Sequence, residues 1–221
     1  MGTQHDASIV AVLGQSGQGK GVYSKARVRA ENPARLLIWD AMNEWADYAR
    51  GWPTLTHLGR QMLRNAAAPW RFRYMPKAAA YSDAIKREFS AFCMLALAAK
   101  NCTVVIEELS FVTLAGYAPP GWAKVCNAGR HAGLRVIGIS QAPADIDKKF
   151  LGNCTEIVTF YLGERPHRET VAVKLDTDPD TIKSLPQFHY LHFDRASRTV
   201  TPGALPPPGA GSATGSNTAE T

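Results

Sequence analysis

A glycine-rich segment near the start of the chain, Gly14–Lys20 (GQSGQGK), restricts the possible folds more than any other feature. It follows the apolar run Ile9–Leu13 and precedes a predicted helix over residues 19–30. The pattern GxxxxGK between a buried strand and a helix is typical of a P-loop, whose backbone N–H groups and helix N-terminus face phosphate oxygens. We expect Lys20 to reach the β- and γ-phosphates of a nucleotide. The expected nucleotide-binding residues are Gly14, Gln15, Ser16, Gly17, Gln18, Gly19, Lys20 and Gly21.

The residue after the lysine departs from the usual motif. That position is normally Ser or Thr, whose hydroxyl binds Mg²⁺, but here it is Gly21. Mg²⁺ must therefore be held by other groups or by water, and nearby candidates are Ser16 and Ser24. We expect this departure to affect ATP hydrolysis more than nucleotide binding.

Two acidic residues follow another apolar run, Thr103–Ile106. In P-loop NTPases the first acid of such a pair orients Mg²⁺ and the second acts on the attacking water. This pattern predicts that Glu107 is the metal-binding residue and Glu108 the catalytic base. The side chain of Glu107 is one methylene longer than that of the usual Asp. We hypothesise that this longer reach partly compensates for the hydroxyl that is missing at Gly21.

A third apolar run, Arg135–Ser140, ends at Gln141. A glutamine amide at the end of a strand beside the P-loop strand can donate to the γ-phosphate and accept from the attacking water. We therefore assign Gln141 as the nucleotide sensor. A glutamine at a strand end is weak evidence alone, and the order of the three motifs supports the assignment.

The apolar runs, separated by helix-length intervals, predict a three-layer α/β fold with a mostly parallel central sheet. We expect one P-loop ATPase domain over residues 1–201, ending in a small hairpin of residues 188–193 and 198–201. Residues 202–221 contain four Pro, four Gly and one charge, Glu220, and are expected to be a disordered tail. The predicted strands are Ile9–Leu13, Arg35–Trp39, Trp70–Tyr74, Thr103–Ile106, Arg135–Ser140 and 155–161, and the predicted helices are 19–30, 54–65, 82–99, 121–131 and 178–185.

Composition excludes several classes of protein. No uninterrupted apolar run, that of residues 92–99 included, comes near the ~20 residues of a membrane span. The first eight residues lack an apolar signal core, so we expect a cytoplasmic protein. The net charge of +6 permits a nucleic-acid or phosphate partner. The four cysteines show no metal-binding spacing, and we expect them to be buried free thiols: Cys93, Cys102, Cys126 and Cys154.

Taken in order, the motifs over residues 9–193 resemble the FtsK–HerA superfamily of RecA/ASCE-like P-loop ATPases, most closely the genome-packaging ATPases of viruses and phages. Besides the P-loop and the two glutamates, the resemblance rests on Asp40 and Glu44 after the second strand (IWDAMNEW) and on Gly129, Arg130 and Gly133 before Gln141. The combination is fairly specific, although no single motif is.

The resemblance implies a homo-oligomeric ring, expected to be a hexamer, that hydrolyses ATP with Mg²⁺ and drives double-stranded DNA through its centre. It implies a capsid vertex or portal protein as partner, and a location in the host cytoplasm or at the packaging vertex of the virion. An arginine from the neighbouring subunit should stabilise the transferring phosphoryl group. Arg130 is the first choice, followed by Arg165 and Arg168.

The sequence is less explicit about DNA contacts. Basic residues that can bind phosphates without reading bases gather over residues 58–87 and after Gln141, although solvated helix faces explain these charges equally well. They are Arg60, Arg64, Arg71, Arg73, Lys77, Lys86, Arg87, Lys148 and Lys149.

Two other functions are compatible with a P-loop. One is a phage assembly protein of the zonula occludens toxin type that binds nucleotide without translocating DNA. The other is a small nucleotide kinase, although a strand-ending acid pair together with a strand-ending glutamine suits a motor better. Stimulation of phosphate release by duplex DNA distinguishes the three.

Overall fold

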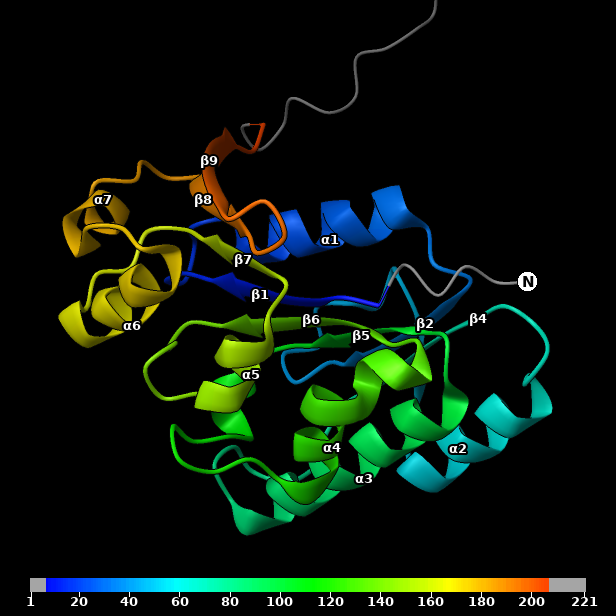
Figure 1. Ribbon diagram of the computed structural model, residues 1–221. Coiled ribbons are helices and arrows are strands. Elements are labelled where there is room, and N and C mark those ends of the chain that lie inside the picture. Colours follow the sequence, from blue (N-terminus) through cyan, green and yellow to red (C-terminus); the bar gives the residue numbers. More distant parts are fainter. Residues whose placement is uncertain (1–6, 207–221) are drawn as a thin grey trace, which may run out of the picture.

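The computed structural model describes residues 7–206, which form a nine-stranded sheet with helices on both faces (Figure 1). The sheet order is β3-β4-β2-β5-β6-β1-β7-β8-β9. All neighbouring strands from β3 to β7 are parallel, whereas β8 and β9 form an antiparallel hairpin at one edge. The strands are β1 (Ile9–Leu13), β2 (Arg35–Trp39), β3 (Arg50–Trp52), β4 (Trp70–Tyr74), β5 (Thr103–Ile106), β6 (Arg135–Ser140), β7 (Glu156–Thr159), β8 (His189–Asp194) and β9 (Thr199–Ala204).

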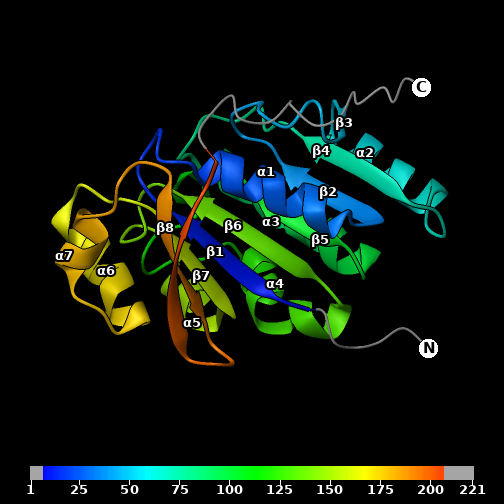
Figure 2. The same cartoon turned by 90° about the horizontal axis from the view of Figure 1, so that it is seen from above.

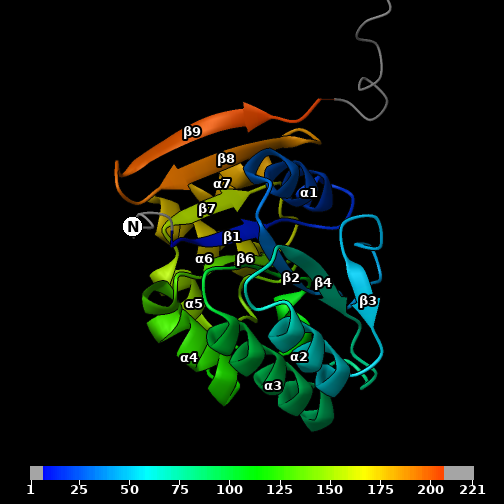
Figure 3. The ribbon, with the colours of Figure 1, turned by 90° about the vertical axis from the view of Figure 1, so that its right-hand side faces the viewer.

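Helices cover the two faces of the sheet unequally. The helix α1 lies on one face, and α2, α3, α4 and α5 lie on the other, while α6 and α7 lie beyond the carboxyl end of β7 (Figures 1 and 3). The helices are α1 (Lys20–Glu31), α2 (Leu55–Arg64), α3 (Asp83–Ala99), α4 (Pro120–Ala128), α5 (Lys148–Asn153), α6 (Arg165–Leu175) and α7 (Pro179–Lys183), with short 3₁₀ turns at Leu109–Phe111 and Gly129–Ala132.

The central strands are apolar on both faces because each face is covered. Along β1, Ile9, Ala11 and Leu13 pack with the helices α2 to α5, whereas Val10 and Val12 pack towards α1. Successive side chains of a strand point to opposite faces, so a strand covered on both sides must be apolar throughout. This explains the uninterrupted apolar runs in the sequence.

The structure confirms the three-layer α/β fold, the mostly parallel sheet and the C-terminal hairpin expected from the sequence. The four cysteines are buried and free, as predicted. Within residues 7–206, no helix is long and apolar enough to span a bilayer. Three elements were not anticipated: β3, α5 and α6. The first two are short, and α6 begins in a polar segment where Pro166 occupies the first turn.

Residue 201, where the sequence analysis expects the domain to end, lies inside the strand β9. The strand β9 continues to Ala204, and Leu205 packs with the α1-side core. Pro202 and Gly203 look like strand breakers in the sequence, but β9 is an edge strand, where proline is tolerated. The rest of the expected tail, residues 207–221, lies outside the described residues.

An ion-pair network joins α1 to the hairpin side of the sheet. Arg27 makes a bidentate contact with Glu156, 2.7 and 2.8 Å from Nη1 and Nη2 to the two carboxylate oxygens, and His192 lies 2.9 Å from the same carboxylate. Burial alone would raise the pKa of Glu156, but its contacts with Arg27 and His192 lower it to about 2. The charged form of Glu156 is therefore favoured in the folded state.

We expect Glu156→Gln to lower the free energy of unfolding by about 1–2 kcal/mol at pH 7, because solvent screening reduces the ~3 kcal/mol that the pKa shift alone represents. Since the folded pKa lies below the ordinary value of 4.5, the difference from wild type should be complete above pH 4.5 and shrink as pH falls towards 2. Urea unfolding at several pH values measures it. A difference in unfolding free energy that does not depend on pH would contradict this assignment. The control is Glu169→Gln, which removes a charge from an exposed pair with Arg165 and should change the stability little.

Candidate nucleotide-binding site

The three motifs found in the sequence meet at one edge of the sheet. In the parallel registers, Leu13 of β1 pairs with Ser140 of β6, and Ile106 of β5 pairs with Gly138 of β6. The P-loop, the two glutamates and Gln141 therefore leave the sheet at the carboxyl ends of adjacent strands, and α1 runs back from this edge over the sheet (Figure 2). Open α/β sheets bind ligands at this edge.

The P-loop needs glycine at its ends for steric reasons. A Cβ on Gly14 would lie 2.7 Å from the Cβ of Phe160, so the loop could not pass the end of β7 with a side chain there. Gly19 has a φ of 116°, and a Cβ there would lie 2.9 Å from Leu205 and 3.1 Å from Phe160 and Phe188. The loop is thus packed closely against β7 and against the chain that follows β9.

Hydrogen bonds hold the loop in place from two sides. The Gln15 N–H donates to the Tyr161 carbonyl at 2.9 Å, and the Gln15 Oε1 accepts from the Gly163 N–H at 3.2 Å. On the other side, the Gln187 Nε2 donates to the Gly17 carbonyl at 3.0 Å. The loop therefore has a defined shape that depends on β7 and on the segment before β8.

Lys20 closes the loop. Its Nζ donates to the Gln15 carbonyl at 3.0 Å, and the residue is buried. Burial lowers the pKa of Lys20, and the negative charges of Glu108 and Glu44 oppose that effect. A cation held across the loop between acidic groups is suited to bind the phosphates of a nucleotide.

The carboxylate of Glu108 lies beside the backbone of Gln141 at the end of β6. The Glu108 Oε1 accepts hydrogen bonds from the Ser110 Oγ at 2.8 Å, the Ser140 Oγ at 3.0 Å and the backbone N–H of Gln141 at 3.2 Å. Glu108 has a left-handed backbone with φ 50° and ψ 75°. Such strain in a residue other than glycine is found at functional sites, and here it turns the carboxylate towards β6 while the Gln141 side chain stays exposed.

Glu107 points the other way, towards the loop after β2. Its Oε2 accepts from the Met42 N–H at 3.0 Å. Burial raises the pKa of Glu107, the Met42 N–H opposes this effect, and Asp40 and Glu44 add to it, so that the pKa is about 8. The two adjacent glutamates therefore occupy different environments, one beside other acids and one beside hydroxyl and N–H donors.

Asp40 organises the acidic side of the site. It is fully buried and forms an ion pair with Arg73, 2.6 Å between Oδ2 and Nη1. Its Oδ1 accepts from the Glu44 N–H at 2.8 Å, and its Oδ2 accepts from the Trp45 N–H. Arg73, a candidate DNA contact in the sequence, thus has its guanidinium on a buried carboxylate.

The donor chemistry of this edge fits Mg²⁺. Hard carboxylate oxygens suit the ion, and a divalent cation would favour the charged form of Glu107, whose pKa is raised by burial and by the nearby Asp40 and Glu44. Within residues 7–206, no three His, Cys, Asp or Glu side chains are placed to hold a metal alone. Mg²⁺ at nucleotide sites takes one or two carboxylates and completes its shell with phosphate and water.

The arginine candidates lie in three different settings. Arg130 is exposed in the turn before β6, at the opposite edge of the sheet from the P-loop. The six residues of β6 span about 20 Å, so Arg130 lies far from the P-loop of its own chain. Arg165 is exposed and pairs with Glu169 at 2.7 Å. Arg168 is buried and donates to the Leu162 and Gly163 carbonyls, which supports the segment that holds Gln15.

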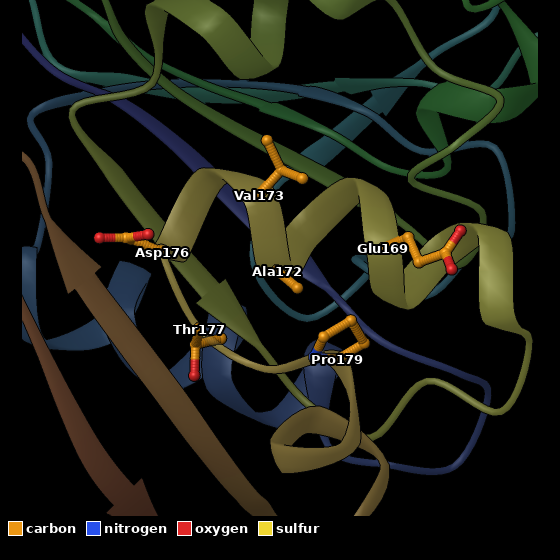
Figure 4. A pocket seen from close by; sticks show the side chains of 6 residues that line it. All are labelled: Glu169, Ala172, Val173, Asp176, Thr177 and Pro179. Atoms are coloured by element: carbon orange, nitrogen blue, oxygen red, sulfur yellow. The ribbon is translucent and has the colours of Figure 1, made fainter.

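A separate hollow of about 320 Å³ lies between α6 and the start of α7. Figure 4 shows Glu169, Ala172 and Val173 along α6, with Asp176 and Thr177 at its end and Pro179 beyond. It has two carboxylates and no cationic side chain, so it does not suit a phosphate.

Comparisons with known proteins agree with this geometry. No protein-family model matches the chain. Protein P9 of Pseudoalteromonas phage PM2 is 24% identical over 186 residues, covering 79% of this chain and 78% of P9. The genome packaging NTPase B204 from Sulfolobus turreted icosahedral virus 2, solved in complex with ATP-gammaS, superposes with a TM-score of 0.69 at 17% identity, covering 89% of this chain and 96% of B204. The chain has the fold of the viral genome-packaging NTPases.

The packaging-NTPase fold is shared more widely. The plasmid coupling protein TrwB, solved in complex with ADP and Mg²⁺, superposes with a TM-score of 0.62 at 12% identity, covering 89% of this chain and 85% of TrwB.

The sequence analysis did not predict three features of the site. They are the hydrogen bond between Gln15 and Gly163, the hydrogen bonds of Arg168 to the segment that holds Gln15, and the hydrogen bond of Gln187 to the P-loop. The only sign of the packing of Gly14 against Phe160 in the sequence is the glycine itself.

We expect Gly14→Ala to lower the free energy of unfolding by about 1–3 kcal/mol, because the new Cβ would overlap Phe160 and force a backbone shift. Urea unfolding measures the loss. Gly116→Ala is the matched control, since a Cβ there would meet nothing within 4 Å. Equal stability of the two variants would show that the loop does not depend on this close approach.

Proposed function

We propose that this chain is an ATPase that packages double-stranded DNA as a homo-oligomeric ring. The observation that carries the proposal is the convergence of Lys20, Glu108 and Gln141 at one sheet edge, in a chain with the packaging-NTPase fold. Neighbours of that fold were solved with an ATP analogue and with ADP and Mg²⁺. The phage P9 relative supports a viral setting.

Each residue has a distinct task in the proposed reaction. Lys20 and the loop N–H groups bind the phosphates. Glu108 accepts a proton from the water that attacks the γ-phosphorus, while the bond to the β–γ bridging oxygen breaks and ADP leaves. Gln141 orients that water, and Glu107 is the proposed metal-binding carboxylate. Mg²⁺, when bound, neutralises charge on the β- and γ-phosphates.

The hydrogen bonds around Glu108 suit a base that must be held in place. Its Oε1 accepts three donors, two of them from Ser140 and Gln141, so the position of β6 fixes the carboxylate. Because the Gln141 N–H also belongs to the sensor residue, a shift of Gln141 on phosphate release would move the base. This contact is a simple means of linking hydrolysis to the state of the nucleotide.

The proposed DNA contacts are Lys86 and Arg87, at the start of α3. They line a groove of about 680 Å³ with Leu114 and Tyr117 of the segment that follows Glu108. Lys86 lies 3.3 Å from Asp83 and 5.6 Å from the Tyr117 ring centroid. Cationic side chains beside a ring bind a phosphate backbone without reading sequence. Capsid vertex or portal proteins are the proposed assembly partners, in the host cytoplasm or at the virion vertex.

We expect duplex DNA to raise the ATPase rate several-fold, because a translocase couples turnover to its track. Phosphate release with and without DNA measures this. Lys20→Ala should abolish the rate, and Lys86→Ala combined with Arg87→Ala should keep the basal rate and lose the stimulation. Phosphoryl transfer to a nucleotide acceptor without stimulation by DNA would favour a kinase, and ATP binding without turnover would favour an assembly protein.

We expect Glu108→Gln to retain ATP and to lower turnover by about 10²–10⁴-fold, the usual contribution of a positioned base. Mixed rings of Glu108→Gln and Arg130→Ala subunits should regain part of the activity, because an Arg130 from one subunit would complete the site of its neighbour. Multiple-turnover rates against mixing ratio measure the gain. Normal turnover by Glu108→Gln would show that the base is misassigned, and a failure of the mixture to recover would argue against Arg130.

A further inference from the structure

The missing hydroxyl at Gly21 leaves open how the cation that accompanies the nucleotide is held. Gly21 lies in the first turn of α1. A Cβ built there would meet one neighbour, the Glu44 Oε2, at 3.7 Å. The position that normally carries the cation-binding hydroxyl therefore faces a carboxylate from a different part of the chain.

Two contacts and a buried neighbouring residue hold Glu44 at this place. Its N–H donates to the buried Asp40 at 2.8 Å, and its Oε2 lies 3.4 Å from the Lys25 Nζ on α1. The next residue, Trp45, is fully buried and anchors the loop. The Glu44 side chain itself is half exposed, with 51% of its surface open to solvent, so its carboxylate has room to bind a ligand.

Glu44 lies near both halves of the site. Its Oε2 faces Gly21, the residue after Lys20. Two residues before Glu44 in the same loop, the Met42 N–H donates to Glu107 at 3.0 Å. The Glu44 carboxylate is therefore near both the P-loop lysine and the proposed metal carboxylate. This is where a divalent cation bridging protein and phosphate has to lie.

We propose that Glu44 supplies the oxygen ligand that a Ser or Thr hydroxyl supplies in other P-loops, and that Gly21 is the residue that gives Glu44 access. The inference rests on the proposed nucleotide site. A carboxylate is a hard anionic ligand suited to Mg²⁺, and a side chain at position 21 would occupy the space beside it.

Two serines are competing candidates. Ser16 is exposed on the loop. Ser24 is fully buried, and its Oγ has no hydrogen-bond partner among the described residues. Ser24 lies three residues beyond Gly21, about 4.5 Å further along the helix axis, and faces the sheet with Lys20 and Val28. It is therefore set deeper than the hydroxyl it would replace.

The test uses Mn²⁺ binding to the complex of the full chain with ADP, followed by electron paramagnetic resonance, so that no turnover is needed. We expect Glu44→Gln to weaken Mn²⁺ binding by tenfold or more while leaving metal-free ADP binding unchanged or tighter, since a negative charge is removed. Adding Gly21→Ser in the Glu44→Gln background should restore most of the loss. Gly21→Ala in the same background should not, because it adds the Cβ without an oxygen.

Further variants distinguish Glu44 from the other candidate ligands. Asp47→Asn removes a charge from the same loop and should leave Mn²⁺ binding unchanged. Unchanged Mn²⁺ binding in Glu44→Gln, equal rescue by Gly21→Ala, or a comparable loss in Ser16→Ala or Ser24→Ala would overturn the inference while leaving the proposed function intact. Failure of the folded wild-type chain to bind ADP would instead overturn the proposed function. Thermal melting of each variant checks folding.

Discussion

The ion pair between Asp40 and Arg73 is the contact on which the acidic half of the site depends. A fully buried carboxylate is tolerated only when charge and hydrogen bonds compensate it, and Arg73 reaches it from the neighbouring strand β4. The same carboxylate fixes the N–H groups of Glu44 and Trp45. That loop in turn offers the Met42 N–H to Glu107. One ion pair thus sets the positions of acids from two strands.

The P-loop half of the site is built differently, by close packing rather than by charge. Gly14 passes Phe160 without room for a Cβ, and the loop carbonyls and amides are fastened to Tyr161, Gly163 and Gln187. The backbone of Glu108 is held in a conformation that costs of order 1–3 kcal/mol. The hydrogen bonds of the Glu108 carboxylate with Ser110, Ser140 and Gln141 help to hold it in this conformation.

The sequence predicts the site better than its surroundings. The P-loop, the acids after β5 and Gln141 each follow an apolar run, and because parallel strands end at the same edge, their meeting could be expected. The orientation of adjacent side chains could not. Glu107 and Glu108 turn towards different neighbours because the backbone of Glu108 is left-handed, and no sequence pattern predicts that conformation. The facing of Gly21 and Glu44 depends on the path of a loop, and local spacing carries no information on it.

The two outer strands of the sheet limit how copies of this chain can associate. At one edge, β3 is only three residues long. At the other, the Leu205 N–H donates to the Phe188 carbonyl, so by the alternation of antiparallel pairing an N–H at position 202 would face outward, and proline has none. Neither outer strand presents a continuous row of outward-facing backbone N–H groups with which a second sheet could pair. Within residues 7–206, these two strands therefore do not favour growth of the sheet from one copy into the next, and copies that meet elsewhere could tilt against each other without breaking a backbone ladder.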